Sequence, residues 1–339
     1  MIRRLTAVRR HPSRSKIRLR SRAPISSEIH HLMLTRRHTP EDIRSWRQEG
    51  AVLLKGFLDS AEVAAVLPDF HQLYGQDLSA ARDRGAVDLK ANGEIGVFTR
   101  DQFLHFDDMP FEASSAINLI ALHPALIAFA KDALHTDDVR LYQSHSWAKF
   151  TGETDYDQAF HCDFKNHTLT VPADDTGLQT VNFMIYFTEV TDAHGAIHFV
   201  PHSLSDSITG RDRTMFPTAD QQLALRSVEQ SGAAGAGSVF AYGIDVFHRG
   251  TNLTATGGHR FTLTASYHAA GNDMIGWSAW PYWFRKPWHH IINNASPDQL
   301  ACLGIPVPGH RFWTSRTIAR TRERWPGWNH LPYEALLRN

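Results

Sequence analysis

Cysteine is scarce in this sequence. The 339 residues include two, Cys162 and Cys302, which are too few for a disulfide framework or for a zinc site built on thiolates. The N-terminal residues also lack the apolar run of a secretory signal. We therefore expect a reduced, cytoplasmic protein.

Long hydrophobic runs are missing as well. The longest apolar candidate, residues 116–134, is interrupted by His123-Pro124 and carries Lys131 and Asp132. A membrane helix needs about 20 predominantly apolar residues in succession. We therefore expect no membrane-spanning segment and no membrane partner.

Neither sign of charge is in excess over the whole chain, but the charges are unevenly distributed. Residues 1–37 contain eleven Lys or Arg and one acid, Glu28, which gives this segment a net charge of +10. Such an arm could bind nucleic acid or anionic lipid, or act as a targeting segment. We interpret residues 1–38 as a disordered leader and expect no nucleic-acid partner.

Helix signals follow this arm. Thr39-Pro40-Glu41-Asp42 is a helix-start sequence, and Gly50 ends the helix. A short strand over 51–55 and a second helix over about 60–74 are expected next. Residues 124–134 also have helical spacing.

From residue 139 the pattern changes to short segments rich in Val, Ile, Phe, Tyr and Thr, separated by Gly- or Asp-rich turns. Many short strands without alternating helices predict an antiparallel sandwich or barrel rather than a parallel sheet. One insertion, 204–230, is expected to be partly helical. The expected strands cover 139–150, 167–171, 179–190, 196–202, 237–243, 245–251 and 260–269.

No internal repeat or clear linker divides the rest of the chain. We predict one domain over residues 39–339, with a strand-rich core at about 139–270 and an aromatic and helical segment over 271–339. The Trp-rich stretch 277–288 could belong to the core or form a lid. A short helix is expected from Ser296-Pro297 to Gly304.

Three His-x-Asp triplets are candidates for a metal site: His105-Phe106-Asp107, His135-Thr136-Asp137 and His161-Cys162-Asp163. The first lies upstream of the strands, and the second ends a predicted helix. The third lies after the first long strand, where side chains two residues apart in an extended segment point the same way. His161 and Asp163 can therefore hold one metal ion together, although a solvated turn is the usual meaning of such a triplet.

A third ligand must come from a distant strand, and His248 is the best candidate. Arg260 follows at the start of a strand rich in Thr and Phe. Two imidazoles and one carboxylate on one face leave coordination positions open, which is typical of non-haem Fe(II) oxygenases. An Arg on the final strand fits 2-oxoglutarate, whose far carboxylate needs a planar fork of donors, and Thr262 on the same face can add a hydrogen bond.

The chain resembles the phytanoyl-CoA dioxygenase family from about residue 39 onward, and residues 143–163 resemble the matching stretch of ectoine hydroxylases. Two departures are Pro201-His202-Ser203-Leu204, where the family often has Pro-Gly-Ser-His, and a slightly longer loop between His248 and Arg260. The resemblance is carried by Thr39-Pro40-Glu41, Gly50–Leu54, Leu58-Asp59-Ser60, His123–Leu126, His161-Cys162-Asp163, Gly195–Pro201, His248 and Arg260.

This resemblance implies a mainly β fold with flanking helices, the double-stranded β-helix or cupin-like jelly roll. It implies that His161, Asp163 and His248 bind Fe(II) and that Arg260 binds 2-oxoglutarate, with O2 as the oxidant. The expected reaction is hydroxylation of an unactivated C–H bond in a small organic substrate, with release of succinate and CO2. Related halogenases have a small residue at the position of Asp163, so its carboxylate favours hydroxylation.

Three further residues share one face of the strand before the motif: Gln143, Trp147 and Lys149. We assign Lys149 to the co-substrate and Gln143 and Trp147 to the substrate pocket, although ordinary strand packing explains them about as well. Two other functions stay open. One is a non-catalytic cupin-like protein that binds metal or 2-oxoglutarate, and the other is a zinc hydrolase using the same three ligands. Neither the substrate nor the oligomeric state can be read from the sequence.

Overall fold

The computed structural model describes part of the chain. The residues described are 36–74, 86–87, 98–99, 111, 113–150, 157–212, 217–275, 292–293, 297, 300 and 305–337. Most of the predicted basic arm, the His105 triplet and the Trp-rich stretch 277–288 lie outside them, as does most of the helix expected after Ser296. The fold below is that of the second of the two units into which the chain divides, residues 35–339.

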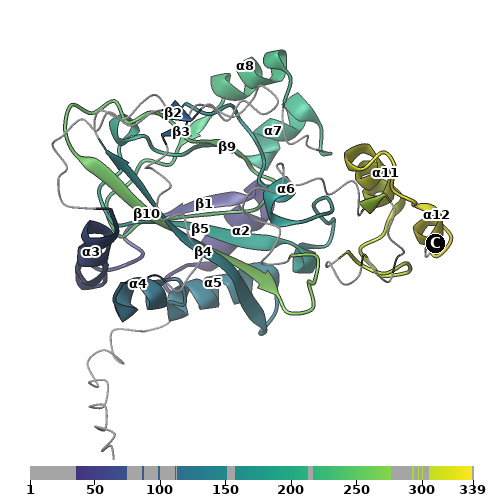
Figure 1. Cartoon of the computed structure of the whole chain (residues 1–339), viewed down its shortest axis with the longest axis horizontal. Coiled ribbons are helices and arrows are strands. Elements are labelled where there is room, and N and C mark those ends of the chain that lie inside the picture. Colours follow the sequence, from purple (N-terminus) through teal and green to yellow (C-terminus); the bar gives the residue numbers. More distant parts are fainter. Residues whose placement is uncertain are drawn as a thin grey trace, which may run out of the picture. The chain divides into compact units, whose positions relative to one another are not determined.

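The second unit contains both helices and strands (Figure 1). The helices are α2 (Pro40–Glu49), α3 (Ser60–Tyr74), α4 (Ser115–Ile120), α5 (Pro124–Leu134), α6 (Phe164–His167), α7 (His202–Thr209), α8 (Ala219–Ser227), α11 (Ser315–Arg324) and α12 (Leu331–Glu334), with 3-10 turns η2 (Thr176–Leu178) and η3 (Asp192–His194). The strands are β1 (Ala51–Leu54), β2 (Ala86–Val87), β3 (Phe98–Thr99), β4 (Val139–Phe150), β5 (Thr180–Tyr186), β6 (His198–Val200), β7 (Gln230–Ser231), β8 (Val239–Tyr242), β9 (Phe247–Arg249) and β10 (His259–Ala269).

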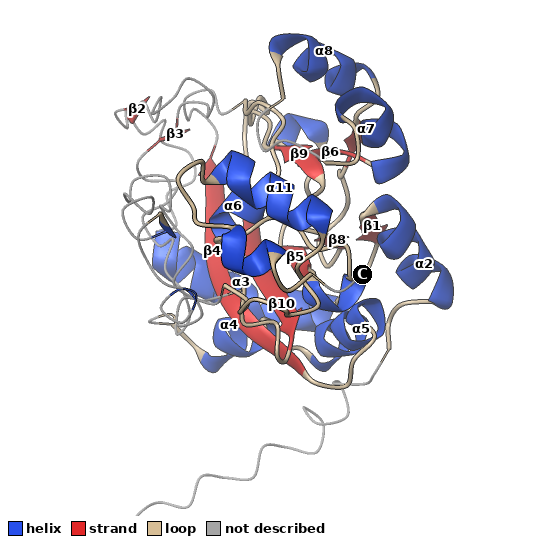
Figure 2. Ribbon diagram, turned by 90° about the vertical axis from the view of Figure 1, so that its right-hand side faces the viewer, coloured by secondary structure: helices blue, strands red, loops and turns tan. Residues whose placement is uncertain are grey.

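Two antiparallel sheets carry the proposed site. The larger has the strand order β1-β8-β5-β10-β4, and the smaller has the order β7-β6-β9. Aromatic side chains pack between the two sheets. The ring centroids of Phe199 in β6 and Phe240 in β8 are 4.8 Å apart. Helices flank the larger sheet (Figure 2). This confirms the predicted mainly β architecture with flanking helices, and the arrangement is that expected for a double-stranded β-helix.

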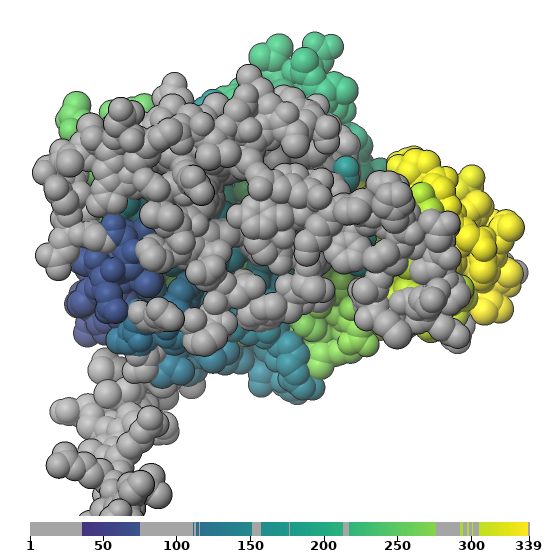
Figure 3. All heavy atoms as spheres, in the orientation of Figure 1, coloured from purple at the N-terminus to yellow at the C-terminus, as the bar shows by residue number. Residues whose placement is uncertain are grey.

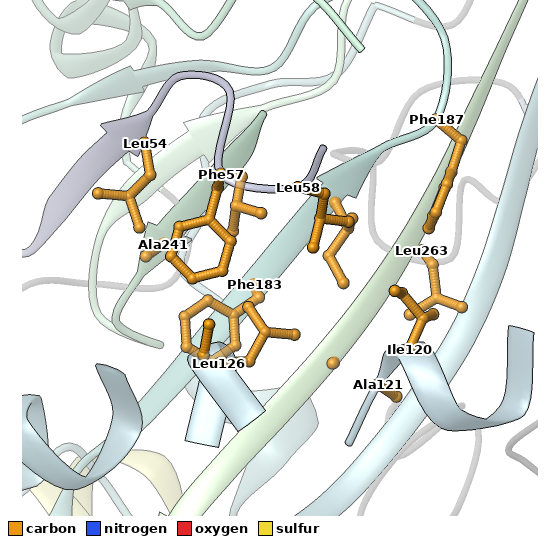
Figure 4. Packing of buried hydrophobic residues seen from close by; sticks show 14 of the residues in the cluster. Leu54, Phe57, Leu58, Ile120, Ala121, Leu126, Phe183, Phe187, Ala241 and Leu263 are labelled. Atoms are coloured by element: carbon orange, nitrogen blue, oxygen red, sulfur yellow. The ribbon is translucent and has the colours of Figure 1, made fainter. Parts of the chain in front are cut away.

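One face of the larger sheet is apolar and lies against helices. Side chains alternate along a strand, so Phe183 of β5 and Leu263 of β10 both point to this face, where they are fully buried. Figure 4 shows Phe183 beside Leu126 of α5, and Leu263 beside Ile120 and Ala121 at the end of α4. Burying one such side chain stabilises the fold by about 1.5–3 kcal/mol.

The opposite face of the same strands is polar. Cross-strand pairing places Arg260 beside Lys149 and Thr262 beside Trp147. All the side chains named here are buried except Trp147, which is partly exposed. The face continues with the pairs Thr264–His145 and Ser266–Gln143. The sheet therefore supplies an apolar core on one side and a row of hydrogen-bonding groups on the other.

The apolar stretch Ala116–Leu134 is long and apolar enough to be a candidate membrane span by length and composition. The structure divides it into α4 and α5, with a turn at residues 121–123. In α5, Leu126 and Phe129 are fully buried against the larger sheet. These residues of the stretch therefore form part of the domain core.

Most of the expected helices and strands are present, but the prediction of one strand is wrong. The strand expected at 167–171 does not form: residues 164–167 make α6, and Thr168 pairs with Ile275 only as an isolated bridge. The β-branched residues of this segment suggested a strand, but its carbonyl groups bond to side chains of α11 instead of to a neighbouring strand. Tertiary contacts have overridden a local preference here.

Glu62 connects three parts of the domain. It closes the N-terminus of α3, because its carboxylate accepts from the Asp59 backbone N–H at 2.9 Å while Asp59 accepts from the Glu62 N–H. The same carboxylate receives two bonds from Arg37, at 2.6 and 2.9 Å, and one from His123 Nε2 at 2.9 Å. Burial alone raises the pKa of Glu62, but these partners lower it below its usual value.

We predict that Glu62→Gln lowers the free energy of unfolding by about 2–3 kcal/mol at pH 7, because Arg37 loses a nearly buried ionic partner. The pKa of Glu62 is lower in the folded than in the unfolded protein. Its contribution is therefore present above the unfolded-state pKa and is lost as pH falls through the folded-state pKa. Urea unfolding at pH 7 and at pH 3 measures both effects. A difference between variant and wild type that is equally large at both pH values would contradict the prediction.

Candidate metal centre

The backbone brings His161 and His248 face to face. Each donates its N–H to the carbonyl of the other at 3.1 Å, so the two form an antiparallel bridge beside the smaller sheet. Side chains of such a pair lie on the same side of the sheet. The two rings are centred 4.6 Å apart as a result.

Asp163 completes the group from the turn that follows His161. Its carboxylate oxygens lie 3.7 Å from His161 Nε2 and 3.4 Å from His248 Nε2. One ligand atom from each of the three residues lies within 4.8 Å of the other two. Among the described residues, this is the group of His, Cys, Asp and Glu side chains with the spacing of a metal site.

The second nitrogen of each ring fixes its orientation. His161 Nδ1 lies 3.0 Å from the carbonyl of Ala159, and His248 Nδ1 lies 3.0 Å from the carbonyl of Val246. A carbonyl only accepts, so Nδ1 carries the proton in both rings. Both Nε2 lone pairs are therefore directed to the shared space beside Asp163, as a metal ligand requires.

The surroundings of Asp163 keep it ionised. Burial alone raises its pKa, but the rings of His248, His167 and His161 lower it below the usual value. The hydroxyl of Tyr242 also donates to Asp163, at 3.4 Å. Burial lowers the pKa of His161 to about 4, so this ring is neutral and free of a competing proton at neutral pH.

The expected co-substrate residues lie together on the polar face of the larger sheet. Arg260 and Lys149 are direct cross-strand partners, and Thr262 lies two residues along β10 on the same side. Arg260 donates to the carbonyl of Gly195, and Lys149 donates to that of Thr251. The Thr262 hydroxyl is fully buried and has no hydrogen-bond partner in the described part of the chain.

The two expected pocket residues also lie on this face. Gln143 donates to Ser266 Oγ at 3.0 Å and lies 3.2 Å from His167 Nε2, while Trp147 donates to Thr264 Oγ1 at 2.9 Å. These two side chains therefore share one face of β4, as the sequence predicted. Cys162, between the proposed ligands, is buried with its thiol directed to the carbonyl of Asp245.

Sequence reasoning missed three residues around this group: Tyr242, His167 and His145. His167 lies four residues after Asp163, with Nε2 3.9 Å from a carboxylate oxygen. It was missed because the segment was expected to be a strand rather than a helical turn. The sequence does contain a signal for His145, because it lies on the same strand face as Gln143 and Trp147. In the structure, burial and the nearby His167 lower the pKa of His145 to about 3.

Solved structures that are similar to this chain include the following three. The non-haem α-ketoglutarate-dependent carbocyclase SnoK from nogalamycin biosynthesis has 19% identity and a TM-score of 0.51, covering 69% of this chain and 85% of its own. The epimerase SnoN, in complex with Fe3+, α-ketoglutarate and nogalamycin RO, has 18% identity and a TM-score of 0.49, covering 68% and 83%. HygX from Streptomyces hygroscopicus, with nickel, 2-oxoglutarate and hygromycin B bound, has 14% identity and a TM-score of 0.47, covering 69% and 88%.

The likeness to SnoK confirms the predicted fold. No curated protein sequence matches the chain. A model of the phytanoyl-CoA dioxygenase family does match, over residues 46–260. This stretch includes the His-x-Asp triplet, the later His248 and Arg260, so the chain belongs to the phytanoyl-CoA dioxygenase family.

Proposed function

We propose that the protein is an Fe(II)- and 2-oxoglutarate-dependent dioxygenase that hydroxylates an unactivated C–H bond of a small organic substrate. The observation that carries this proposal is the group formed by His161, Asp163 and His248. Membership of the phytanoyl-CoA dioxygenase family supports the same activity. Succinate and CO2 are the expected co-products.

The donor set fits Fe(II). Two imidazoles and one carboxylate form the three-ligand set of non-haem iron oxygenases and leave room for further ligands. Ligand atoms about 2.0–2.2 Å from one ion lie at most about 4.4 Å apart. The Nε2-to-carboxylate distances of 3.7 Å for His161 and 3.4 Å for His248 are within this span.

The polar face of β10 fits 2-oxoglutarate. Arg260 can offer a planar pair of N–H donors to a carboxylate, and Thr262 supplies a buried hydroxyl that has no partner in the described residues. An unsatisfied buried hydroxyl costs about 1–3 kcal/mol. A carboxylate that accepts from Thr262 and Arg260 removes this cost, and Lys149 adds positive charge next to Arg260.

When bound, Fe(II) and 2-oxoglutarate supply the O2-dependent oxidation. The protein's own residues orient the side chains that would hold the metal. The carbonyls of Ala159 and Val246 hold the two imidazoles in the ligand tautomer. Tyr242 holds the carboxylate of Asp163 by a hydrogen bond. Because Asp163 is a carboxylate rather than a small residue, we assign hydroxylation rather than halogenation to the site.

Further along the same face, buried polar groups favour a substrate with hydrogen-bonding atoms. Gln143 Oε1 and Asn182 Nδ2 are buried, and neither has a partner in the described part of the chain. One is an acceptor and the other a donor, so a hydroxyl or amide group can bond to each. Trp147, which is partly exposed, offers an aromatic surface nearby. These features support a small polar molecule as the substrate.

The two alternative functions make different use of Arg260 and Thr262. A zinc hydrolase has no role for a buried Arg and hydroxyl on the sheet face. A non-catalytic binding protein binds both cofactors without consuming 2-oxoglutarate in the presence of any substrate. Turnover of 2-oxoglutarate therefore separates the dioxygenase from both.

For the proposed function, we first predict the binding of both cofactors. Anaerobic addition of 2-oxoglutarate to the Fe(II)-loaded protein is expected to give the weak visible charge-transfer band of the chelate, and His161→Ala is expected to abolish it. Arg260→Ala should raise the 2-oxoglutarate concentration at half-saturation about 100-fold, and Thr262→Val about tenfold, from loss of charged and neutral hydrogen bonds respectively.

Arg140→Ala is the matched control, since Arg140 is exposed on the same strand as Lys149. It is expected to leave the titration unchanged. A wild-type protein that binds Fe(II) tightly but gives no band would refute the dioxygenase proposal and favour a hydrolytic or metal-binding role.

The second prediction concerns metal binding alone. Metal that binds only the folded state stabilises it, by about 2.7 kcal/mol at a free concentration 100 times Kd. Anaerobic Fe(II) should therefore raise the Tm of the wild type, and a chelator should reverse the rise. His248→Ala should abolish the shift, whereas His330→Ala, which changes a histidine outside the group, should retain it. An equal rise in Tm for His248→Ala would exclude His248 as a ligand.

A further inference from the structure

The C-terminal helix α11 contacts the segment that follows Asp163. Its last residue, Arg324, donates to the main-chain carbonyl of Thr168 at 2.8 Å, to that of Lys165 at 3.2 Å, and to that of Thr170. One guanidinium thus binds three carbonyl groups in a span of six residues. Desolvation lowers the pKa of Arg324 to about 9, which leaves it protonated at neutral pH.

The next residue, Trp325, adds a fourth bond to the same segment. Its indole N–H donates to the carbonyl of Leu169 at 2.8 Å. The Arg324 guanidinium also lies 6.0 Å from the ring of Phe164 and 5.2 Å from that of Trp325. Leu169 and Trp325 belong to one buried apolar cluster, so the polar bonds are sheltered from water.

The segment held in this way follows one proposed metal ligand, Asp163, and carries His167, which lies beside it. Asp163 precedes α6 directly, and its side chain makes no capping bond to that helix, so the carboxylate remains directed to the histidines. His167 is the last residue of α6, 3.9 Å from the same carboxylate. A helix of four residues has little stability of its own, and its last carbonyls need partners.

The contacts come from a part of the chain that the family model does not cover. That match ends at residue 260, whereas α11 begins at Ser315. Figure 2 shows α11 next to α6. In Figure 3 the C-terminal helices, in yellow, form one group at one side of the view.

We propose that α11 is a positioning element of the metal centre: Arg324 and Trp325 hold the main chain of residues 165–170, and through it Asp163 and His167, in the arrangement that binds metal. The inference rests on the proposed function for the identity of the metal ligands. Arg324 and Trp325 are not among the three proposed metal ligands. Both act through the backbone of the intervening segment.

The test measures metal affinity without turnover. Anaerobic Fe(II) dissociation constants are determined by competition with a chromophoric chelator at low temperature, for wild type and for Arg324→Met, Arg324→Lys and Trp325→Phe. Arg322→Met is the matched control, because Arg322 is on the same helix but its side chain is 53% exposed. The Tm of each metal-free protein and hydrogen exchange over residues 161–170 are measured alongside.

Arg324→Met is expected to weaken Fe(II) binding about 10–100-fold, the range for loss of groups that support metal ligands. Exchange over residues 164–170 should rise in the same variant. Arg324→Lys, which keeps the charge but not the planar fork, should recover part of the affinity. Trp325→Phe should weaken binding less, since one bond is lost, and Arg322→Met should match the wild type.

Affinities equal to the wild type in the folded Arg324 and Trp325 variants would overturn the inference, even if their Tm is lower, because α11 would then support only the fold. If Arg324→Met does not fold, the comparison of Arg324→Lys and Trp325→Phe with Arg322→Met decides in the same way. Failure of the wild type to bind Fe(II) is a separate result. It overturns the proposed function, and this inference with it.

Discussion

The site depends on one backbone contact, the antiparallel bridge in which His161 and His248 exchange both hydrogen bonds. The two histidines are far apart in sequence, and the bridge fixes their side chains on one face. Their Nδ1 atoms then bond to carbonyls two residues earlier in each segment. The lone pairs are thus oriented by the fold, which reduces the reorganisation needed when an ion binds.

The larger sheet separates an apolar interior on one face from a polar interior on the other. Because side chains alternate along a strand, β5 and β10 can bury Phe183 and Leu263 against the helices while they direct Thr262 and Asn182 to the other side. The apolar face stabilises the domain. The polar face carries buried hydroxyl and amide atoms that have no partner among the residues the structure describes, a cost that is offset when a ligand bonds to them.

The segment after Asp163 shows how a local sequence can be redirected by a distant one. Its residues have strand character, yet within the described part of the chain its β pairing is limited to the bridge between Thr168 and Ile275. Arg324 satisfies its carbonyls instead. A guanidinium can do this because it offers five N–H donors in one plane, so a single side chain replaces the ladder that a neighbouring strand would supply.

The sequence by itself determined those features that arise from local rules. Thr39, Pro40 and Gly50 defined α2, with Gly50 in the left-handed conformation at φ 76°, and alternation defined β4 and β10 with their polar and apolar faces. The spacing of His161, Asp163, His248 and Arg260 predicted a metal site, and the family was named from a resemblance that runs along the chain from about residue 39. Only the tertiary structure decided the partners of each group. The bonds of Arg324 and the approach of Tyr242 and His167 to Asp163 depend on which distant segments pack together, and no local pattern encodes that.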